Sequence, residues 1–180
     1  LFVGRKAEAS LCSEFIPVIA QSLDTFVPKE IRTFRSLFQY LMELASSKAF
    51  NLVIDEFQEF YNINESVYSD MQNIWDTYRQ KSKMNLIVSG SVYSLMQKIF
   101  QNNKEPLFGR ADNIIKLSAF DLATLKEIMH DYKPKYTNDD LLALYSFTGG
   151  IPKYVELFCD NNMLTVDEMI SFMIRDNSPF

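Results

Sequence analysis

Two adjacent acidic residues, Asp55 and Glu56, follow an apolar run and are the strongest chemical feature of the sequence. The run, residues 50–54, has the pattern of a strand buried between two layers of helices. Acidic groups after such a strand lie where open α/β sheets bind their ligands. There one carboxylate can hold Mg²⁺ on a nucleotide, and the other can orient or deprotonate a water molecule. The alternative is a buried strand that ends in a solvated acidic turn.

Two serines, Ser89 and Ser91, lie at the end of a second predicted strand, which covers residues 85–90. A hydroxyl at the end of a neighbouring strand can contact the γ-phosphate of a nucleotide or the attacking water. The structural alternative is a strand-to-helix turn in which Ser91 caps the following helix. The residue types alone leave both interpretations open.

Two further groups could bind phosphate. Arg110 follows a loop that contains a glycine, and its planar guanidinium can donate several hydrogen bonds at once. Gly149 and Gly150 come shortly before Pro152 and Lys153, and this sequence combines a tight turn, a helix amino terminus and a positive charge. The structural alternatives are a solvated arginine and a helix end followed directly by a helix start.

The elements that must position these groups alternate between strand and helix in the first two thirds of the chain. From residue 121 only helices are expected, so the sequence predicts an α/β domain over residues 1–120 and a helical appendage over residues 121–180. Pro17 is expected to break or kink the first helix. The strands are expected at residues 1–4, 50–54, 85–90 and 114–117.

The composition is that of an ordinary globular protein, with 180 residues of which 47% are hydrophobic and 23% charged. The net charge of −5 argues against a broad basic surface for nucleic acid. The single His130 cannot build a His-rich metal site, and Cys12 and Cys159 are expected to be reduced thiols of a cytoplasmic protein. No apolar run approaches the length of a membrane span.

In combination, these pieces resemble the archaeal-type ATPase family, a branch of the STAND and AAA-like P-loop ATPases. The resemblance implies that Asp55 and Glu56 belong to the Walker B motif and that the strand before Ser89 is the sensor strand. It also implies that the Pro-Leu-x-Gly-Arg loop and the Gly-Gly-x-Pro turn of a helical lid are family features. The segments that carry the resemblance are residues 52–58, 86–91, 105–110 and 147–154.

The same resemblance implies ATP and Mg²⁺ as cofactors. Asp55 would bind the metal and Glu56 would activate the attacking water. Ser89 or Ser91 would sense the γ-phosphate. The groups that would contact phosphate or couple to a neighbouring molecule are Arg110 and the turn at residues 149–153.

The glycine-rich loop that cradles phosphates, GxxxxGK[ST], does not occur in the sequence. None of the five glycines begins such a motif, and Gly4 is followed by Arg and Lys at the wrong spacing. The resemblance therefore predicts the first strand and the P-loop upstream of residue 1, with residues 1–4 as the second strand. Another interpretation takes residues 2–5 as the box that opens many such ATPases. Similar proteins also continue past residue 180, often into a winged-helix or nuclease-like domain.

The expected fold is thus a P-loop NTPase-type parallel sheet without its first strand, flanked by helices and followed by a helical lid. In this class the strand order is 5-1-4-3-2, so the missing strand would lie between the strands that contain Ser89 and Ile114. Such a gap leaves backbone groups unpaired, which is costly. Another chain's strand in a homo-oligomer, a rearrangement or a separate segment could fill it.

The leading hypothesis for function is a fragment of an ATP-hydrolysing P-loop ATPase that binds ATP poorly by itself. The alternative is a non-catalytic interaction module on an ATPase scaffold. A metal-dependent nuclease ranks third, because no second buried acidic pair is evident. The expected partner is a nucleotide in the intact protein. No membrane is expected, and nucleic acid only through a domain outside this chain.

Overall fold

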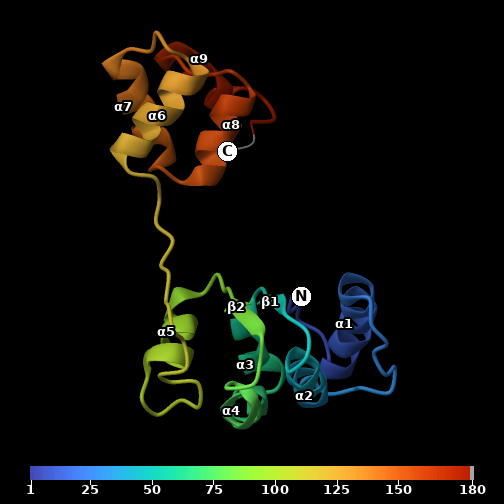
Figure 1. Ribbon diagram of the computed structural model, residues 1–180. Helices are drawn as coiled ribbons and strands as arrows, with labels where there is room; N and C mark the ends of the chain where they lie inside the picture. Colours follow the sequence, from blue (N-terminus) through green and yellow to red (C-terminus); the bar gives the residue numbers. More distant parts are fainter. Residues whose placement is uncertain (179–180) are drawn as a thin grey trace. The chain divides into compact units, whose positions relative to one another are not determined.

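The computed structural model describes residues 1–178 and divides into two compact units, one ending at Ile114 and the other beginning at Ile115. The first unit contains a small parallel sheet and helices α1 to α5, and the second contains helices α6 to α9 (Figure 1). The sequence predicts a boundary at residues 120 and 121.

The sheet of the first unit is built from two parallel strands, β1 (Phe50–Ile54) and β2 (Met84–Val88). Their register pairs Ile54 with Val88, so both strands end at the same edge. The amino-terminal residues run along the other side of β1 through a single parallel bridge between Phe2 and Asp55. This edge order, amino-terminal segment, β1, β2, is the one expected for strands two, three and four of the predicted sheet.

Helices pack against the sheet through a core rich in phenylalanine. The Phe34 and Phe60 rings lie 4.6 Å apart between centroids, and Phe57 packs edge-on against Tyr68 at 5.4 Å. All four side chains are buried, so the segment that follows the acidic pair is anchored in the core. The helices are α1 (Glu8–Leu23), α2 (Phe34–Ala45), α3 (Phe60–Ile63), α4 (Ser66–Tyr78) and α5 (Tyr93–Gln101), with a 3-10 helix, η1 (Phe57–Glu59).

Burial alternates along the strands, which differs from the burial on both faces that the apolar run predicts. Leu52 and Ile54 lie in the core, whereas Val53 and its neighbour Ile87 are 45% and 46% exposed on the other face. Alternate side chains of a strand point to opposite faces, so the described first unit covers only one face of this sheet.

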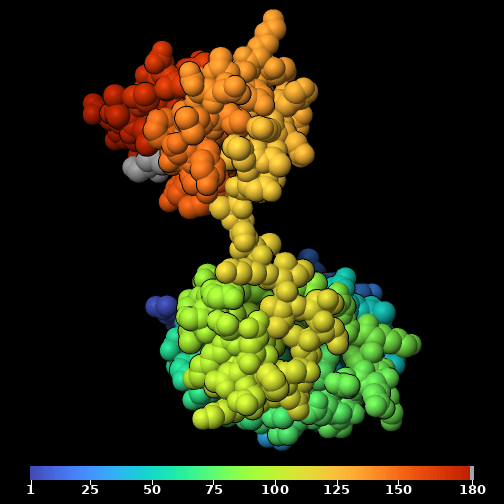
Figure 2. All heavy atoms as spheres, turned by 90° about the vertical axis from the view of Figure 1, so that its left-hand side faces the viewer, coloured from blue at the N-terminus to red at the C-terminus, as the bar shows by residue number. Residues whose placement is uncertain are grey.

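The predicted strand over residues 114–117 is wrong for this structure, which assigns no strand there. Ile115 and Leu117 are 82% and 90% exposed, in the yellow segment of Figure 2. The composition suits a strand, but a strand persists only where a neighbouring strand takes up its backbone hydrogen bonds. The helix does not break at Pro17, because α1 continues through this residue.

The second unit is a cluster of four helices with a core of its own. Side chains cap three of its helices: Asp121 accepts a hydrogen bond from the Thr124 amide at 2.8 Å, and Thr137 and Thr165 each form a capping box. The side chains of Phe158 and Phe172 are buried in this core. The helices are α6 (Leu122–Tyr132), α7 (Asn138–Thr148), α8 (Pro152–Asp160) and α9 (Val166–Ile174).

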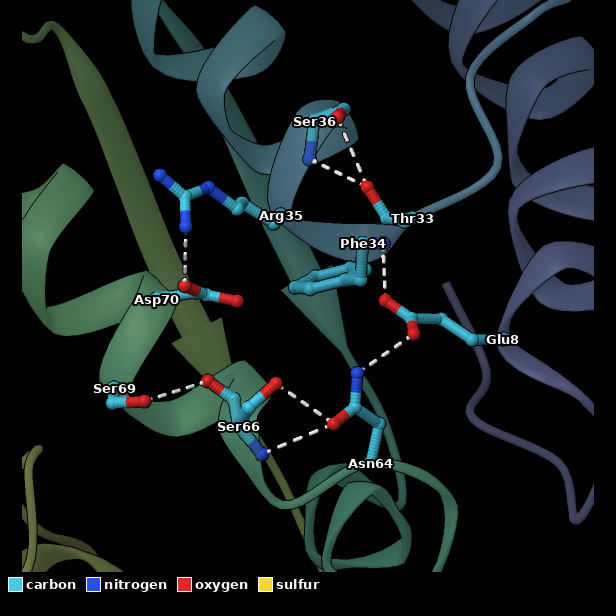
Figure 3. Close-up of polar contacts among 9 residues, drawn as sticks. All are labelled: Glu8, Thr33, Phe34, Arg35, Ser36, Asn64, Ser66, Ser69 and Asp70. Atoms are coloured by element: carbon cyan, nitrogen blue, oxygen red, sulfur yellow. Dashed lines mark hydrogen bonds and ion pairs between the residues drawn. The ribbon is translucent and has the colours of Figure 1, made fainter.

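A carboxylate at the start of α1 joins three segments of the first unit (Figure 3). Oε1 of Glu8 accepts a hydrogen bond from the Phe34 amide at 2.6 Å, and Oε2 accepts one from Nδ2 of Asn64 at 2.8 Å. The first bond satisfies an amide at the amino terminus of α2, which has no partner within the helix itself. The second holds the loop before α4. Glu8 therefore fixes how the helices meet below the sheet.

We expect Glu8→Ala to lower the free energy of unfolding of the first unit by about 2 kcal/mol, the range for hydrogen bonds to a charged group. Trp75 lies in α4 and makes fluorescence-detected urea unfolding a suitable measurement. Glu14→Ala is the matched control, since Glu14 lies on the same helix in an exposed pair with Lys6 and is expected to cost under about 0.5 kcal/mol. Equal losses for the two variants would contradict the bridging role of Glu8.

Candidate functional site

The predicted acidic residues and serines meet at the carboxyl edge of the sheet. Backbone bonds continue the pairing of the two strands past their ends: the Ser89 amide donates to the Ile54 carbonyl and the Phe57 amide to the Ser89 carbonyl, both at 2.9 Å. These bonds fix Ser89 opposite the turn that carries Asp55 and Glu56. The four side chains predicted at this edge are thus brought together by the strand register.

Asp55 is held through one of its two carboxylate oxygens. Oδ1 accepts a hydrogen bond from the Ser89 hydroxyl at 2.6 Å and another from the Glu56 amide at 3.0 Å. Within residues 1–178 both bonds use Oδ1, which leaves Oδ2 available to a ligand. A carboxylate oriented in this way can bind a hard cation through its second oxygen.

Glu56 is fixed in a similar manner, by a different serine. Its Oε2 accepts a hydrogen bond from the Ser91 hydroxyl at 2.8 Å and another from Nε2 of Gln58. The backbone of Glu56 is left-handed, with φ 54° and ψ 38°, which is uncommon for a residue other than glycine. This conformation ends the strand and turns the chain into η1. Ser91 therefore contacts the acidic pair, and α5 begins without a side-chain cap, so the capping alternative for Ser91 is wrong.

Arg110 is engaged elsewhere in the first unit. Its guanidinium forms a fork on Asp76 of α4, with Nη2 donating to Oδ2 at 2.7 Å and Nε to Oδ1 at 3.2 Å. Nη1 donates to the Phe108 carbonyl at 2.9 Å. The hydrogen bond from Arg110 holds the pKa of Asp76 below its ordinary value. The arginine therefore fastens its own loop to α4 and is not a solvated side chain.

The glycine pair lies in the second unit, where it forms a turn between helices. Gly149 ends α7 with φ 57°, and Gly150 has φ 72°. A Cβ on Gly150 would lie 2.2 Å from the carbonyl oxygen of Phe120, so this position requires glycine. Pro152 opens α8, and Lys153 forms an exposed ion pair with Glu156 at 2.8 Å. A helix end followed directly by a helix start accounts for all of these contacts.

A third carboxylate near the edge, that of Glu59, has a structural partner. Arg5 donates from Nε and Nη2 to Oε2 and Oε1 of Glu59, at 3.0 and 3.2 Å. The Glu59 side chain is only 10% exposed, and the hydrogen bond from Arg5 lowers its pKa. This fork ties the amino-terminal segment to η1, the short helix directly after Glu56.

Gln58 also takes part in this site, although the sequence predicts no role for it. Its side chain is 1% exposed, and its amide nitrogen contacts Glu56. The sequence shows only that a polar residue, Gln58, follows Glu56 by two positions and lies between Phe57 and Phe60. The sequence alone does not assign a partner to such a residue, because its bond depends on the left-handed turn at Glu56.

The donor set at the edge suits Mg²⁺ and no more elaborate metal centre. Magnesium is typically held by one or two carboxylates, with water and substrate phosphates completing its shell. Asp55 could supply one ligand, and the Ser89 hydroxyl lies beside it. Within residues 1–178 no group of three or more His, Cys, Asp or Glu side chains could hold a metal ion. A nuclease that needs several converging acids is therefore poorly supported by these residues.

A parallel sheet whose carboxyl edge holds an acidic pair and two serines defines an α/β domain of the ligand-binding type. The chain belongs to the family described as the ATPase domain predominantly from Archaea, which matches residues 6–158. The resemblance inferred from the motifs and the predicted α/β fold are thereby confirmed. The function supported at this level is that of an ATPase domain.

Two similar proteins extend this comparison. Over 130 residues the chain is 30% identical to the uncharacterized protein MJECL04 of Methanocaldococcus jannaschii, covering 68% of this chain and 29% of that protein. The fold matches the Walker-type ATPase PABY2304 of Pyrococcus abyssi with a TM-score of 0.63 and 15% identity, over 93% of this chain and 55% of that one. The chain thus spans under a third of the first relative and about half of the second.

Among residues 1–178, no helix is long and apolar enough to cross a membrane.

We expect Arg5→Met to destabilise the first unit at pH 7 and to do so less at lower pH. The lowered pKa of Glu59 means that its contribution is present above its ordinary value of 4.5 and is lost as the pH falls through the lowered pKa. Urea unfolding of both proteins between pH 7 and pH 3 measures the difference. Lys6→Met, which removes an exposed pair, is the control and should show little dependence on pH. A gap that stays constant with pH would contradict the role of the fork.

Proposed function

We propose that this chain is the part of a P-loop ATPase core that follows the phosphate-binding loop, together with the helical lid. Its motifs resemble those of the STAND and AAA-like branch of these ATPases, and we propose that it belongs there. The observation that carries the proposal is the arrangement of Asp55 and Glu56. Each carboxylate is bound through one oxygen by a serine of the neighbouring strand end, and the other oxygen remains available to a ligand.

The roles follow from this arrangement. Asp55, the metal ligand of a Walker B motif, would hold Mg²⁺ through Oδ2. Glu56 would accept a proton at Oε1 from the attacking water, while the water oxygen bonds to the γ-phosphorus of ATP and the bond to ADP breaks. Ser89 or Ser91 would act as the sensor: their hydroxyls contact the carboxylates in this structure and could exchange those bonds for the γ-phosphate.

The phosphate-binding loop itself would come from polypeptide outside these residues. Three observations support this. The described sheet ends at β2, and Val53 and Ile87 leave one of its faces exposed. In addition, Ile114, Ile115 and Leu117 are exposed in a segment that forms no strand. A further strand beside β2, followed by a helix over the exposed face, would bury these surfaces. We propose an upstream segment as its source, and a second chain in a homo-oligomer as the alternative.

The second unit and Arg110 have proposed roles in the same reaction. The turn with Gly149, Gly150, Pro152 and Lys153 would contact phosphate or couple to a neighbouring molecule, as its glycines and lysine allow. Arg110 would do so only after leaving Asp76. We propose a cytoplasmic protein whose partner is a nucleotide. It would contact nucleic acid only through another domain.

A second candidate function is a non-catalytic interaction module on the ATPase scaffold. The observation that favours it is the absence of the GxxxxGK[ST] loop from these 180 residues. In that case the hydrogen bonds of Asp55 and Glu56 would serve only to close the end of the sheet.

We expect Mg²⁺-dependent ATP binding by a polypeptide extended upstream by roughly 30–50 residues, the length of a strand, P-loop and helix. The 180-residue chain alone should bind ATP far more weakly, because it lacks the loop that cradles the phosphates. Isothermal titration with and without Mg²⁺ compares the two. Equal, tight binding by both would refute the upstream position of the loop, and an extension without the Gly-Lys-Ser/Thr would favour the interaction module.

We further expect Glu56→Gln, in the extended polypeptide, to lower kcat about 10²- to 10⁴-fold while ATP still binds, since a general base contributes in that range. Asp55→Asn should instead weaken the Mg²⁺-dependent part of ATP binding. Steady-state phosphate release and ATP titration separate the two effects. Asp70→Asn is the control, because Asp70 pairs with Arg35 on the surface. Unchanged hydrolysis by Glu56→Gln would remove Glu56 from the reaction.

A further inference from the structure

Among the buried side-chain nitrogen and oxygen atoms of residues 1–178, one lacks a hydrogen-bond partner, and it is Oε1 of Gln58. A glutamine that leaves its amide oxygen unsatisfied costs free energy that an apolar side chain of the same length would not. Stability therefore does not explain a glutamine at this position. Its other amide atom, Nε2, donates to Oε2 of Glu56.

We propose that Gln58 is a positioning residue that holds the Glu56 carboxylate in the orientation needed to take a proton from water. The proposal rests on the proposed function, in which Glu56 is the general base. It extends that function to a buried residue that the sequence analysis did not single out.

The geometry of the carboxylate carries this proposal. Gln58 and Ser91 both donate to Oε2 of Glu56, Ser91 at 2.8 Å. Two donors on one oxygen restrict the rotation of the carboxylate about its last bond. They occupy the lone pairs of Oε2, so the lone pairs of Oε1 remain free to accept a proton. A base presented through a single oxygen in a fixed direction is closer to the geometry of attack than one that rotates.

The amide of Gln58 can perform this task because its own backbone is fixed. Gln58 lies in η1, and its backbone carbonyl oxygen accepts a hydrogen bond from the buried hydroxyl of Tyr68 at 3.3 Å. The preceding Phe57 ring is buried and packs against Tyr68. The side chain therefore projects from a rigid turn, in contrast to a surface glutamine that could adopt many rotamers.

Gly90 provides the space for the amide. A Cβ at this position would lie 2.1 Å from Oε1 of Gln58 and 2.7 Å from Sδ of Met96. Gly90 is not among the residues with positive φ, so its backbone conformation is one that alanine also adopts. Its missing side chain matters for the room it leaves between Ser89 and Ser91. The turn after β2 thus supplies the hydroxyls and the space for Gln58 together.

The test uses the extended polypeptide with Gln58→Met, which keeps the length of the side chain and removes the amide, and with Gly90→Ala, which displaces the amide and keeps it. We expect kcat for ATP to fall about tenfold or more in each, as for the loss of an outer-shell partner, with KM for MgATP changed less than twofold. The double variant should be no slower than the slower single variant, because both changes act on one contact.

Matched controls separate this role from general damage. Gln39→Met removes an equivalent amide-to-carboxylate bond on the surface of α2, 2.9 Å to Glu43. Gly4→Ala adds a Cβ whose nearest neighbour atom lies at an ordinary 3.6 Å. Both should leave kcat within twofold. If Gln58→Met does not fold, as judged by Trp75 fluorescence, Gly90→Ala alone decides the question.

The outcomes distinguish the two proposals. If Glu56→Gln abolishes hydrolysis while Gln58→Met or Gly90→Ala keeps the full kcat, the positioning role is overturned and the ATPase role stands. If KM rises and kcat is unchanged, Gln58 serves nucleotide binding and the positioning role is likewise overturned. If Glu56→Gln hydrolyses ATP normally, Glu56 is not the general base, and the positioning role is overturned while the ATPase role stands. If the unsubstituted extended polypeptide hydrolyses no ATP, the proposed function itself fails.

Discussion

The parallel register of β1 and β2 is the constraint on which the site depends. Pairing Ile54 with Val88 makes the two strands end together, and the bonds from the Ser89 amide and to the Ser89 carbonyl extend that pairing into the turn. A slip of one residue would move the serine hydroxyls to the opposite face of the sheet. The contact between Ser89 and Asp55, at 2.6 Å, exists only in this register.

The core beneath the sheet makes the turn after β1 rigid. Phe57 in η1 and Phe60 in α3 follow the acidic pair and are both fully buried. A non-glycine residue in the left-handed region costs of order 1–3 kcal/mol. The burial of the two rings offsets this cost at Glu56. Strain at a site persists only where the surroundings determine the conformation, and here the aromatic core does so.

Much of this organisation could be predicted from the sequence, because it rests on local signals. Apolar runs gave both strands, and the caps at Asp121, Thr137 and Thr165 follow from short-range hydrogen bonds. The strand at residues 114–117 could not be predicted correctly, since strand formation depends on a partner that composition does not reveal. The pairing of Arg110 was equally invisible, because its acidic partner lies 34 residues away in sequence.

The left-handed turn at Glu56 resolves a geometric conflict in the motif. Adjacent residues of a continuing strand point to opposite faces, so Asp55 and Glu56 would be separated by the sheet if β1 ran on. With φ 54° at Glu56 the strand ends between them. Ser89 then reaches one carboxylate and Ser91 the other, although these serines are themselves only two residues apart. An Asp-Glu pair can therefore act on one ligand only where the strand stops at the aspartate, and the buried Gln58 lies where it can hold the second carboxylate after that turn.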